Sequence, residues 1–218
     1  MAKLLEIKDM SVRYRVSSGM LSAVNNVNLT INTAETFCLI GESGCGKSTL
    51  AFALMRLLMN GSEKISGSAV LDGIDLLKIS EKEMEGIRGK KIGMIFQNPL
   101  DSLNPVYRSG TQVVEALMLD GISKSEATER TIELYKDLKI PDAESRISSF
   151  PHELSGGMRQ RAMIAMMLAR HPKLLIADEP TTALDVTIEK QILEIFKRLK
   201  QEKQMSFLII THNFGIVA

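Results

Sequence analysis

Eight residues in the first quarter of the chain form a pattern suited to binding phosphate. They read Gly41-Glu42-Ser43-Gly44-Cys45-Gly46-Lys47-Ser48, follow the apolar run Phe37–Ile40 and fit G-x-x-x-x-G-K-[ST]. In such a loop the backbone N–H groups point into one concavity, the lysine supplies a mobile charge, and the last hydroxyl can hold Mg²⁺. The expected ligand is a nucleoside triphosphate, and the alternative is a flexible loop without a ligand. The expected contacts are Gly41, Ser43, Gly44, Cys45, Gly46, Lys47, Ser48 and Thr49.

Two adjacent carboxylates follow the apolar run Leu174–Ala177. We expect Asp178 to help hold Mg²⁺ through water, beside Ser48, and Glu179 to polarise the attacking water as the general base. On its own, an acidic pair after a strand is often a solvated turn or a helix cap. Because a phosphate loop lies upstream, the pair favours nucleotide hydrolysis.

A second glycine-rich segment precedes a long helical pattern. Ser155, Gly156 and Gly157 stand at the start of the run that ends near Arg170, so a hydroxyl and free N–H groups meet at a helix start. One chain cannot easily bring two separate helix ends to the same triphosphate. The segment therefore suggests a role at a nucleotide held by another copy, and a plain serine-capped helix is the alternative.

The elements that must position these residues indicate an α/β fold. Ile92–Phe96 and Phe207–Ile210 are, like the two runs above, continuous and apolar, as strands buried on both faces of a parallel sheet are. Helical patterns separate the runs, as in the fourfold spacing of Ile188, Ile192 and Phe196. This alternation predicts a parallel sheet with crossover helices.

The first part of the chain has a different pattern. Short β-like runs separated by turn-forming residues predict a small antiparallel sheet beside the core, at Leu4–Ile7, Ser11–Tyr14, Val27–Ile31 and Ser68–Leu71.

From Asn98 to Arg170 the pattern is mostly helical and starts in a proline-punctuated loop. Within it, Ser123-Lys124-Ser125-Glu126 has the form of a capping box, and Ala127 and Thr131 begin an apolar helical face. We expect a helical insertion.

Bulk composition excludes several classes of protein. The 218 residues carry 27 Lys plus Arg and 26 Asp plus Glu, a net charge of +1, and no block of like charge favours nucleic acid. No apolar stretch approaches the ~18 residues of a membrane span, and charges interrupt the start of the chain where a signal peptide needs apolar residues. We expect a cytosolic protein whose two cysteines, Cys38 and Cys45, are reduced thiols; a redox switch at Cys45 is an alternative.

These motifs together resemble the nucleotide-binding subunits of ATP-binding cassette (ABC) transporters, over essentially the whole chain. Leu154–Met158 looks like the signature motif of that family, Gln97 like its glutamine loop, Ala183-Leu184-Asp185 like its D-loop and His212 like its switch histidine. The resemblance is closer still to the branch that imports peptides or nickel, through Gln97–Pro105, Pro151–Leu154 and Ile176–Val186.

The resemblance implies a fold and a set of partners. It implies a P-loop NTPase with a RecA-like core and an antiparallel β-subdomain at residues 1–97 and 171–218, and an α-helical subdomain at residues 98–170. A head-to-tail pair, homo- or heterodimeric, would sandwich two ATP with Mg²⁺ in the cytoplasm, on the inner face of the cell membrane. Two membrane permease subunits and, indirectly, an extracytoplasmic solute-binding protein would complete the system, with no nucleic acid.

The resemblance also implies residue roles. Gln97 and His212 would assist Glu179 in catalysis, and Gln97 would also contact the metal. Ser155, Gly156 and Gly157 would reach the nucleotide of the partner, and Asp185 would contact nucleotide. Tyr14 falls where the family places an aromatic residue that stacks on adenine, although packing within a sheet is the alternative.

The chain departs from the family pattern at its end. Asn213 stands where an Asp usually follows the histidine, and the sequence stops at Ala218, where relatives continue. We expect the C-terminal remainder of the family domain to be absent and hydrolysis by this form to be weak. A non-transport cassette ATPase and a truncated cassette that only binds nucleotide are the alternatives.

Overall fold

A parallel sheet lies at the centre of the fold. The computed structural model describes residues 2–17, 19–58, 63–97, 103–180 and 186–212. Four strands pair in parallel in the order β3 (Thr36–Ile40), β8 (Ser206–Thr211), β7 (Leu174–Asp178) and β6 (Ile92–Ile95). Every residue of β6, β7 and β8 is buried, because helices cover both faces of the sheet. The prediction of four parallel strands is confirmed, although β3 at the edge of the sheet is only half-buried.

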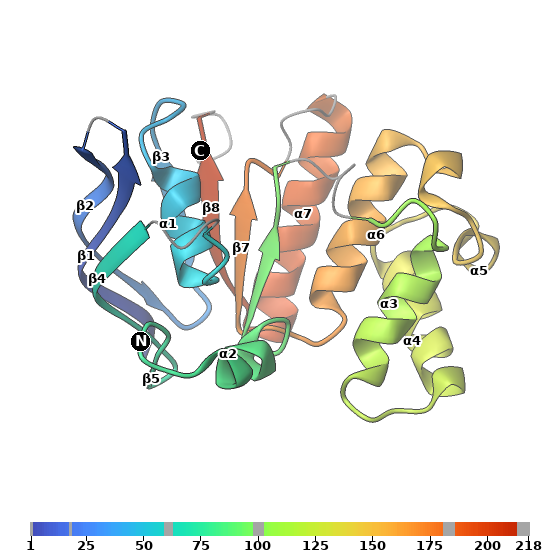
Figure 1. The fold of residues 1–218 in the computed structure, drawn as a ribbon. Helices are drawn as coiled ribbons and strands as arrows, with labels where there is room; N and C mark the ends of the chain where they lie inside the picture. Colours follow the sequence, from blue (N-terminus) through green and yellow to red (C-terminus); the bar gives the residue numbers. More distant parts are fainter. Residues whose placement is uncertain (1, 18, 59–62, 98–102, 181–185, 213–218) are drawn as a thin grey trace.

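The carboxyl ends of these strands meet at one edge of the sheet, which is where ligands bind in such folds. Strand β3 leads into the phosphate loop and α1 (Lys47–Leu54), and β7 leads into Glu179. Strand β6 is followed by Gln97 and β8 by His212. Figure 1 shows the arrowheads of β7 and β8 at the same edge.

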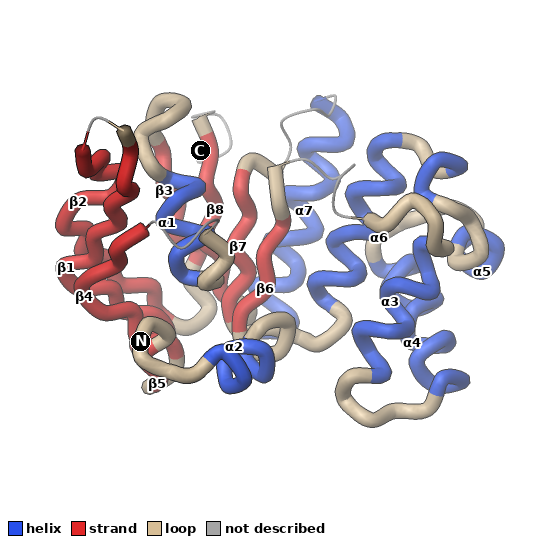
Figure 2. Tube along the Cα trace, viewed as in Figure 1, coloured by secondary structure: helices blue, strands red, loops and turns tan. Residues whose placement is uncertain are grey.

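An antiparallel sheet lies beside this core, as predicted (Figure 2). Its order is β2 (Gly19–Asn32), β1 (Lys3–Val16), β4 (Glu63–Leu71) and β5 (Ile74–Asp75).

The separation of Leu4–Ile7 from Ser11–Tyr14 is wrong, because both lie in the single strand β1. The pairing of β1 with β2 shifts register between Ile7 and Met10, and Asp9 there has a positive φ of 50°. A bulge therefore absorbs the turn-forming residues without turning the chain. Gly67 on β4 accommodates it, since a Cβ at Gly67 would lie 2.5 Å from the Asp9 carbonyl oxygen.

Apart from α2, the remaining helices are α7 and the group beyond it, on the side away from β3 and α1 (Figures 1 and 2). In chain order they are α2 (Glu81–Ile87), α3 (Ser109–Met118), α4 (Lys124–Asp137), α5 (Ala143–Arg146), the 3-10 turn Pro151–Glu153, α6 (Gly156–Leu168) and α7 (Val186–Lys203). Ser123 caps α4 by accepting a hydrogen bond from the Glu126 N–H, whereas the Glu126 carboxylate pairs with Arg130. Within the described part of the chain, no helix is both long and apolar enough to cross a membrane.

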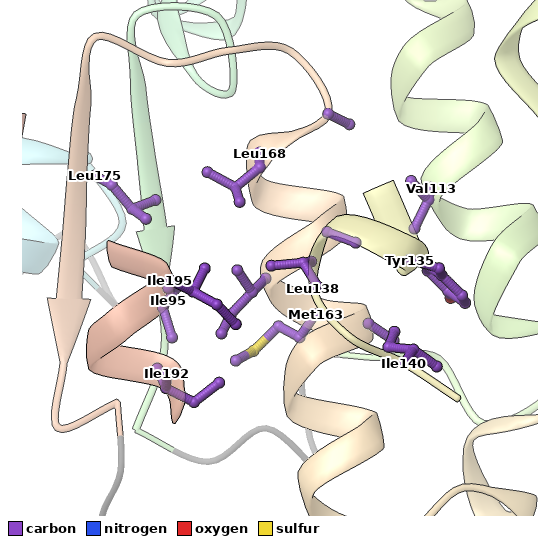
Figure 3. Packing of buried hydrophobic residues seen from close by; sticks show 14 of the residues in the cluster. Ile95, Val113, Tyr135, Leu138, Ile140, Met163, Leu168, Leu175, Ile192 and Ile195 are labelled. Carbon is purple, nitrogen blue, oxygen red and sulfur yellow. The ribbon is translucent and has the colours of Figure 1, made fainter. Parts of the chain in front are cut away.

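Helix α6 packs between the sheet and the outer helices (Figure 3). Met163 and Leu168 of α6 share one buried cluster with Leu175 of β7 and Tyr135 of α4. The Arg161 guanidinium, also on α6, donates a 2.6 Å hydrogen bond to the Lys139 carbonyl after α4 and a second bond to the Gln191 side chain on α7. These contacts fix the direction of α6 relative to both neighbours.

Candidate nucleotide-binding and hydrolysis site

The phosphate loop is tightly held against the antiparallel sheet. Gly46 precedes α1 with a φ of 96°, and a Cβ at Gly46 would lie only 2.1 Å from the Ala23 carbonyl oxygen of β2. Lys47 is 8% exposed, and its ammonium donates 2.7 Å hydrogen bonds to the carbonyl oxygens of Gly41 and Glu42. The lysine side chain therefore folds back over the loop. From there its ammonium group can donate these hydrogen bonds to phosphate oxygens in place of the two carbonyls.

Replacing Gly46 by alanine is expected to lower the free energy of unfolding by more than about 2 kcal/mol, because a left-handed conformation costs an L-residue roughly 1–2 kcal/mol before any clash. Gly73 is the matched control, since it has a φ of 81° and open space around its Cβ position. Denaturant unfolding of Gly46→Ala and Gly73→Ala separates the clash from the backbone strain. Equal losses in the two variants would contradict close packing of the loop on β2.

Asp178 and Ser48 supply oxygen atoms beside the loop. Asp178 is 2% exposed, and its Oδ1 atom has no hydrogen-bond partner among the described residues. Burial raises the pKa of Asp178 and the nearby Glu179 adds to that rise, while a hydrogen bond from Ser48 and the charge of Lys47 oppose it. A buried carboxylate with a free oxygen beside a hydroxyl suits a hard divalent cation such as Mg²⁺.

Asp178→Asn is expected to raise the melting temperature of the metal-free protein at pH 7. Burial raises the pKa of Asp178 in the folded state above its ordinary value of 3.8. Below pH 3.8 the carboxyl is neutral and its burial does not reduce the free energy of unfolding, whereas that penalty grows as the pH rises through the raised pKa. Each kcal/mol relieved corresponds to about 2–4 °C for a chain of this size. Thermal unfolding at pH 4 and pH 7 measures it, with exposed Asp142→Asn as the control; a lower melting temperature at pH 7 would contradict the prediction.

Three side chains from three strand ends meet at Glu179. The Gln97 Nε2 atom donates a 2.7 Å hydrogen bond to Glu179 Oε2, and His212 Nδ1 lies 3.0 Å from Glu179 Oε1. The Glu179 side chain is 11% exposed, its φ is 46°, and its N–H donates to the Ile210 carbonyl of β8. The turn after β7 thus aims the carboxylate at the groups that follow β6 and β8.

The segment Ser155–Gly157 lies elsewhere. Ser155 caps α6 by accepting a hydrogen bond from the Met158 N–H at 3.3 Å. Ser155 and Gly156 are exposed, and Figure 1 shows α6 separated from β3 and α1 by the strands and α7. Within one chain, these residues do not join the cluster at Glu179.

Tyr14 packs within the antiparallel sheet. It is half-buried against the apolar cluster there and pairs with Leu21 on β2. A hollow of about 330 Å³ beside the phosphate loop is lined by residues of β2, including Ala23 and Val24, and by Lys47, but not by Tyr14. Sequence reasoning missed Ala23 and Val24, because nothing in an Ala-Val pair signals that β2 runs alongside the loop.

Asp185 lies outside the described residues, as does Asn213.

Comparisons with known proteins agree on one family. The family model described as ABC transporter matches residues 24–182. The oligopeptide transport ATP-binding protein OppD of Salmonella typhimurium is 49% identical over 99% of this chain and 64% of its own length. OppD of Bacillus subtilis is 49% identical over 99% of this chain and 61% of its own length. The chain therefore spans less than two thirds of these relatives.

The fold has a similar solved structure, described as a dimeric post-hydrolysis state of the ATP-binding cassette MJ0796 bound to ADP and Pi. It is 29% identical, with a TM-score of 0.87, over 98% of this chain and 90% of that one.

Proposed function

The chain belongs to the ABC transporter family, and from this premise we propose that it binds and hydrolyses ATP to drive the import of peptides. The observation that carries the proposal is the meeting of Gln97, Glu179 and His212 at the sheet edge where the phosphate loop also begins. This edge combines a cradle for phosphate with a carboxylate held by two polar partners.

In the proposed reaction the Glu179 carboxylate accepts a proton from the attacking water, whose oxygen bonds to the γ-phosphorus as the bond to ADP breaks. Gln97 and His212 hold the carboxylate and orient the water. Lys47 and the loop N–H groups stabilise the charge on the phosphate oxygens. Ser48 and Asp178 would hold Mg²⁺, with Gln97 near it, and the ion would supply further positive charge there.

The assembly is also a proposal. Ser155, Gly156 and Gly157 would complete the site on a second subunit, homo- or heterodimeric, which would explain why the segment lies apart from the loop with Ser155 and Gly156 exposed. The solved relative described as dimeric supports this arrangement. We further propose that Tyr14 and Asp185 contact nucleotide, and that residues 98–170 act as a helical subdomain on a core of residues 1–97 and 171–218.

The cargo is proposed from relatives named for oligopeptide transport, and on that support we choose peptides over a nickel complex. Two permease subunits at the inner face of the membrane, and indirectly a solute-binding protein, would complete the system. Co-purification with two permease subunits tests this assignment against a non-transport ATPase. Purification without any membrane protein, under conditions that keep permeases soluble, would contradict it.

Lys47→Ala is expected to weaken ATP binding roughly 10- to 150-fold, because each charge-assisted hydrogen bond contributes about 1.5–3 kcal/mol. Titration calorimetry with Mg-ATP measures the affinity, and Lys82→Ala, an exposed lysine on α2, is the matched control. Unchanged affinity in Lys47→Ala would remove this loop from the site.

A further inference from the structure

A second hollow lies far from the phosphate loop, at the junction of the outer helices with the core. Its volume is about 220 Å³, and its walls come from α3, α4, the end of α6 with the residues just after it, α7 and Met205 just before β8. Pockets for drug-sized ligands usually measure roughly 300–1,000 Å³. The hollow is therefore suited to a smaller molecule.

The floor of this hollow is apolar. Leu117, Leu168 and Met205 are each 3% exposed, and the half-buried Leu134 and Leu199 complete the surface. These side chains present branched or flexible hydrocarbon to whatever enters. An apolar group of a few carbons would be removed from water there.

The rim carries opposite charges on facing helices. Glu133 and Asp137 lie on α4 at a spacing that places both on one helix face, and Lys203 lies on α7. The two helices are adjacent, since the Arg198 guanidinium of α7 donates a 2.7 Å hydrogen bond to the Asp137 carbonyl. Within the described part of the chain, no ion pair engages the side chain of Glu133, Asp137 or Lys203.

The other two polar side chains of the rim, Arg130 and His171, add no free charge to this arrangement of two carboxylates and one ammonium. Arg130 is already paired with Glu126 at 2.6 Å. Partial desolvation, with Lys203 and Arg130 nearby, lowers the pKa of His171, so its ring is neutral at pH 7. Two carboxylates on one wall and one ammonium on the other thus line the same hollow.

We propose that this hollow binds a free α-amino acid with a branched apolar side chain. The ligand's ammonium group would face Glu133 and Asp137, its carboxylate would face Lys203, and its side chain would rest on Leu117 and Leu168. The small volume favours a single amino acid over a peptide. Such amino acids are what hydrolysis of an imported peptide would release.

Titration calorimetry with four probes tests the chemistry. L-leucine carries all three features, 4-methylpentanoate lacks the ammonium, leucinamide lacks the carboxylate, and glycine lacks the side chain. We expect L-leucine to bind and each of the others to bind at least about fivefold more weakly. For 4-methylpentanoate and leucinamide this is the scale of one exposed ion pair, and for glycine the loss comes from the missing apolar side chain. No binding of L-leucine, or equal binding of any of the three, would overturn the proposal.

Charge reversals on the two walls locate the site. Lys203→Glu and Glu133→Lys are each expected to weaken L-leucine binding roughly five- to thirtyfold, because each replaces an attraction by a repulsion. Lys197→Glu and Glu129→Lys are the controls, exposed on the same helices but outside the hollow. Matching melting temperatures show that all four are folded, and equal weakening by variants and controls would overturn the assignment.

Binding of an amino acid in the hollow should also affect ATP turnover, an expectation that rests on the proposed ATPase function. The amino acid would bridge α4 and α7 beside the end of α6, the helix that Ser155 caps, and would resist any shift of α6 during turnover. We therefore expect saturating L-leucine to slow ATP turnover in the parent chain but not in Lys203→Glu. Turnover unaffected by bound L-leucine would overturn this consequence, whereas absence of ATP turnover without L-leucine would count against the proposed function and leave the binding result standing.

Discussion

Glu179→Gln is expected to bind Mg-ATP as tightly as the parent chain and to hydrolyse it about 10²- to 10⁴-fold more slowly, the usual contribution of a positioned general base. The amide keeps the shape of the carboxylate and removes its basicity. Because Gln97 Nε2 and His212 Nδ1 contact the two different carboxylate oxygens, an amide also disturbs one of these contacts. We therefore expect the substitution to lower the rate of hydrolysis and to leave the affinity for Mg-ATP unchanged.

Steady-state ATPase assays and calorimetry on the same preparations separate the two quantities. Glu85→Gln, an exposed glutamate on α2, is the matched control and should hydrolyse ATP at the parent rate. If Glu179→Gln did the same with unchanged Mg²⁺ dependence, another residue would have to act as the base.

The parallel sheet could be predicted from sequence because its strands are covered on both faces. Burial of β6, β7 and β8 on both faces favours an apolar run inside each strand, and polar residues such as Asp178 and Thr211 stand at the strand ends. The place of Asp178 and Glu179 at a strand end was predictable for the same reason.

Features that depend on spatial neighbours were not predictable. Lys8 and Asp9 have the composition of a turn, and only pairing of β1 with strands on both sides keeps the chain extended through them. Gln97 and Glu179 are 82 residues apart, and their hydrogen bond depends on β6 and β7 being neighbours. The packing of Gly46 against Ala23 likewise depends on a sheet that the local sequence does not specify.

Ser155→Arg is expected to leave ATP binding by the single chain nearly intact and to abolish ATP-dependent dimerisation and hydrolysis. Ser155 is exposed at the start of α6 and lies apart from the phosphate loop of its own chain, so an added side chain there would block a partner's nucleotide only. Ser125→Arg, an exposed position at the start of α4, is the matched control and should dimerise normally.

Loss of the helix cap must be separated from loss of the partner contact, since removing a serine cap costs about 0.5–2 kcal/mol of stability. Ser155→Asp serves this purpose, because aspartate also caps helices but would set a carboxylate against the partner's phosphate. We expect Ser155→Asp to melt near the parent temperature and still fail to hydrolyse ATP. Parent-level hydrolysis by Ser155→Asp would show that Ser155 acts only as a cap.

A mixture of two inactive chains gives the strongest test of the partner assignment. In a head-to-tail pair of Ser155→Arg with Lys47→Ala, one site combines an intact loop with an intact Ser155, and the other site carries both defects. Hydrolysis should therefore reappear on mixing although neither chain is active alone. If both residues served a nucleotide within the same chain, each chain would carry one defect in its only site, and mixing would restore nothing.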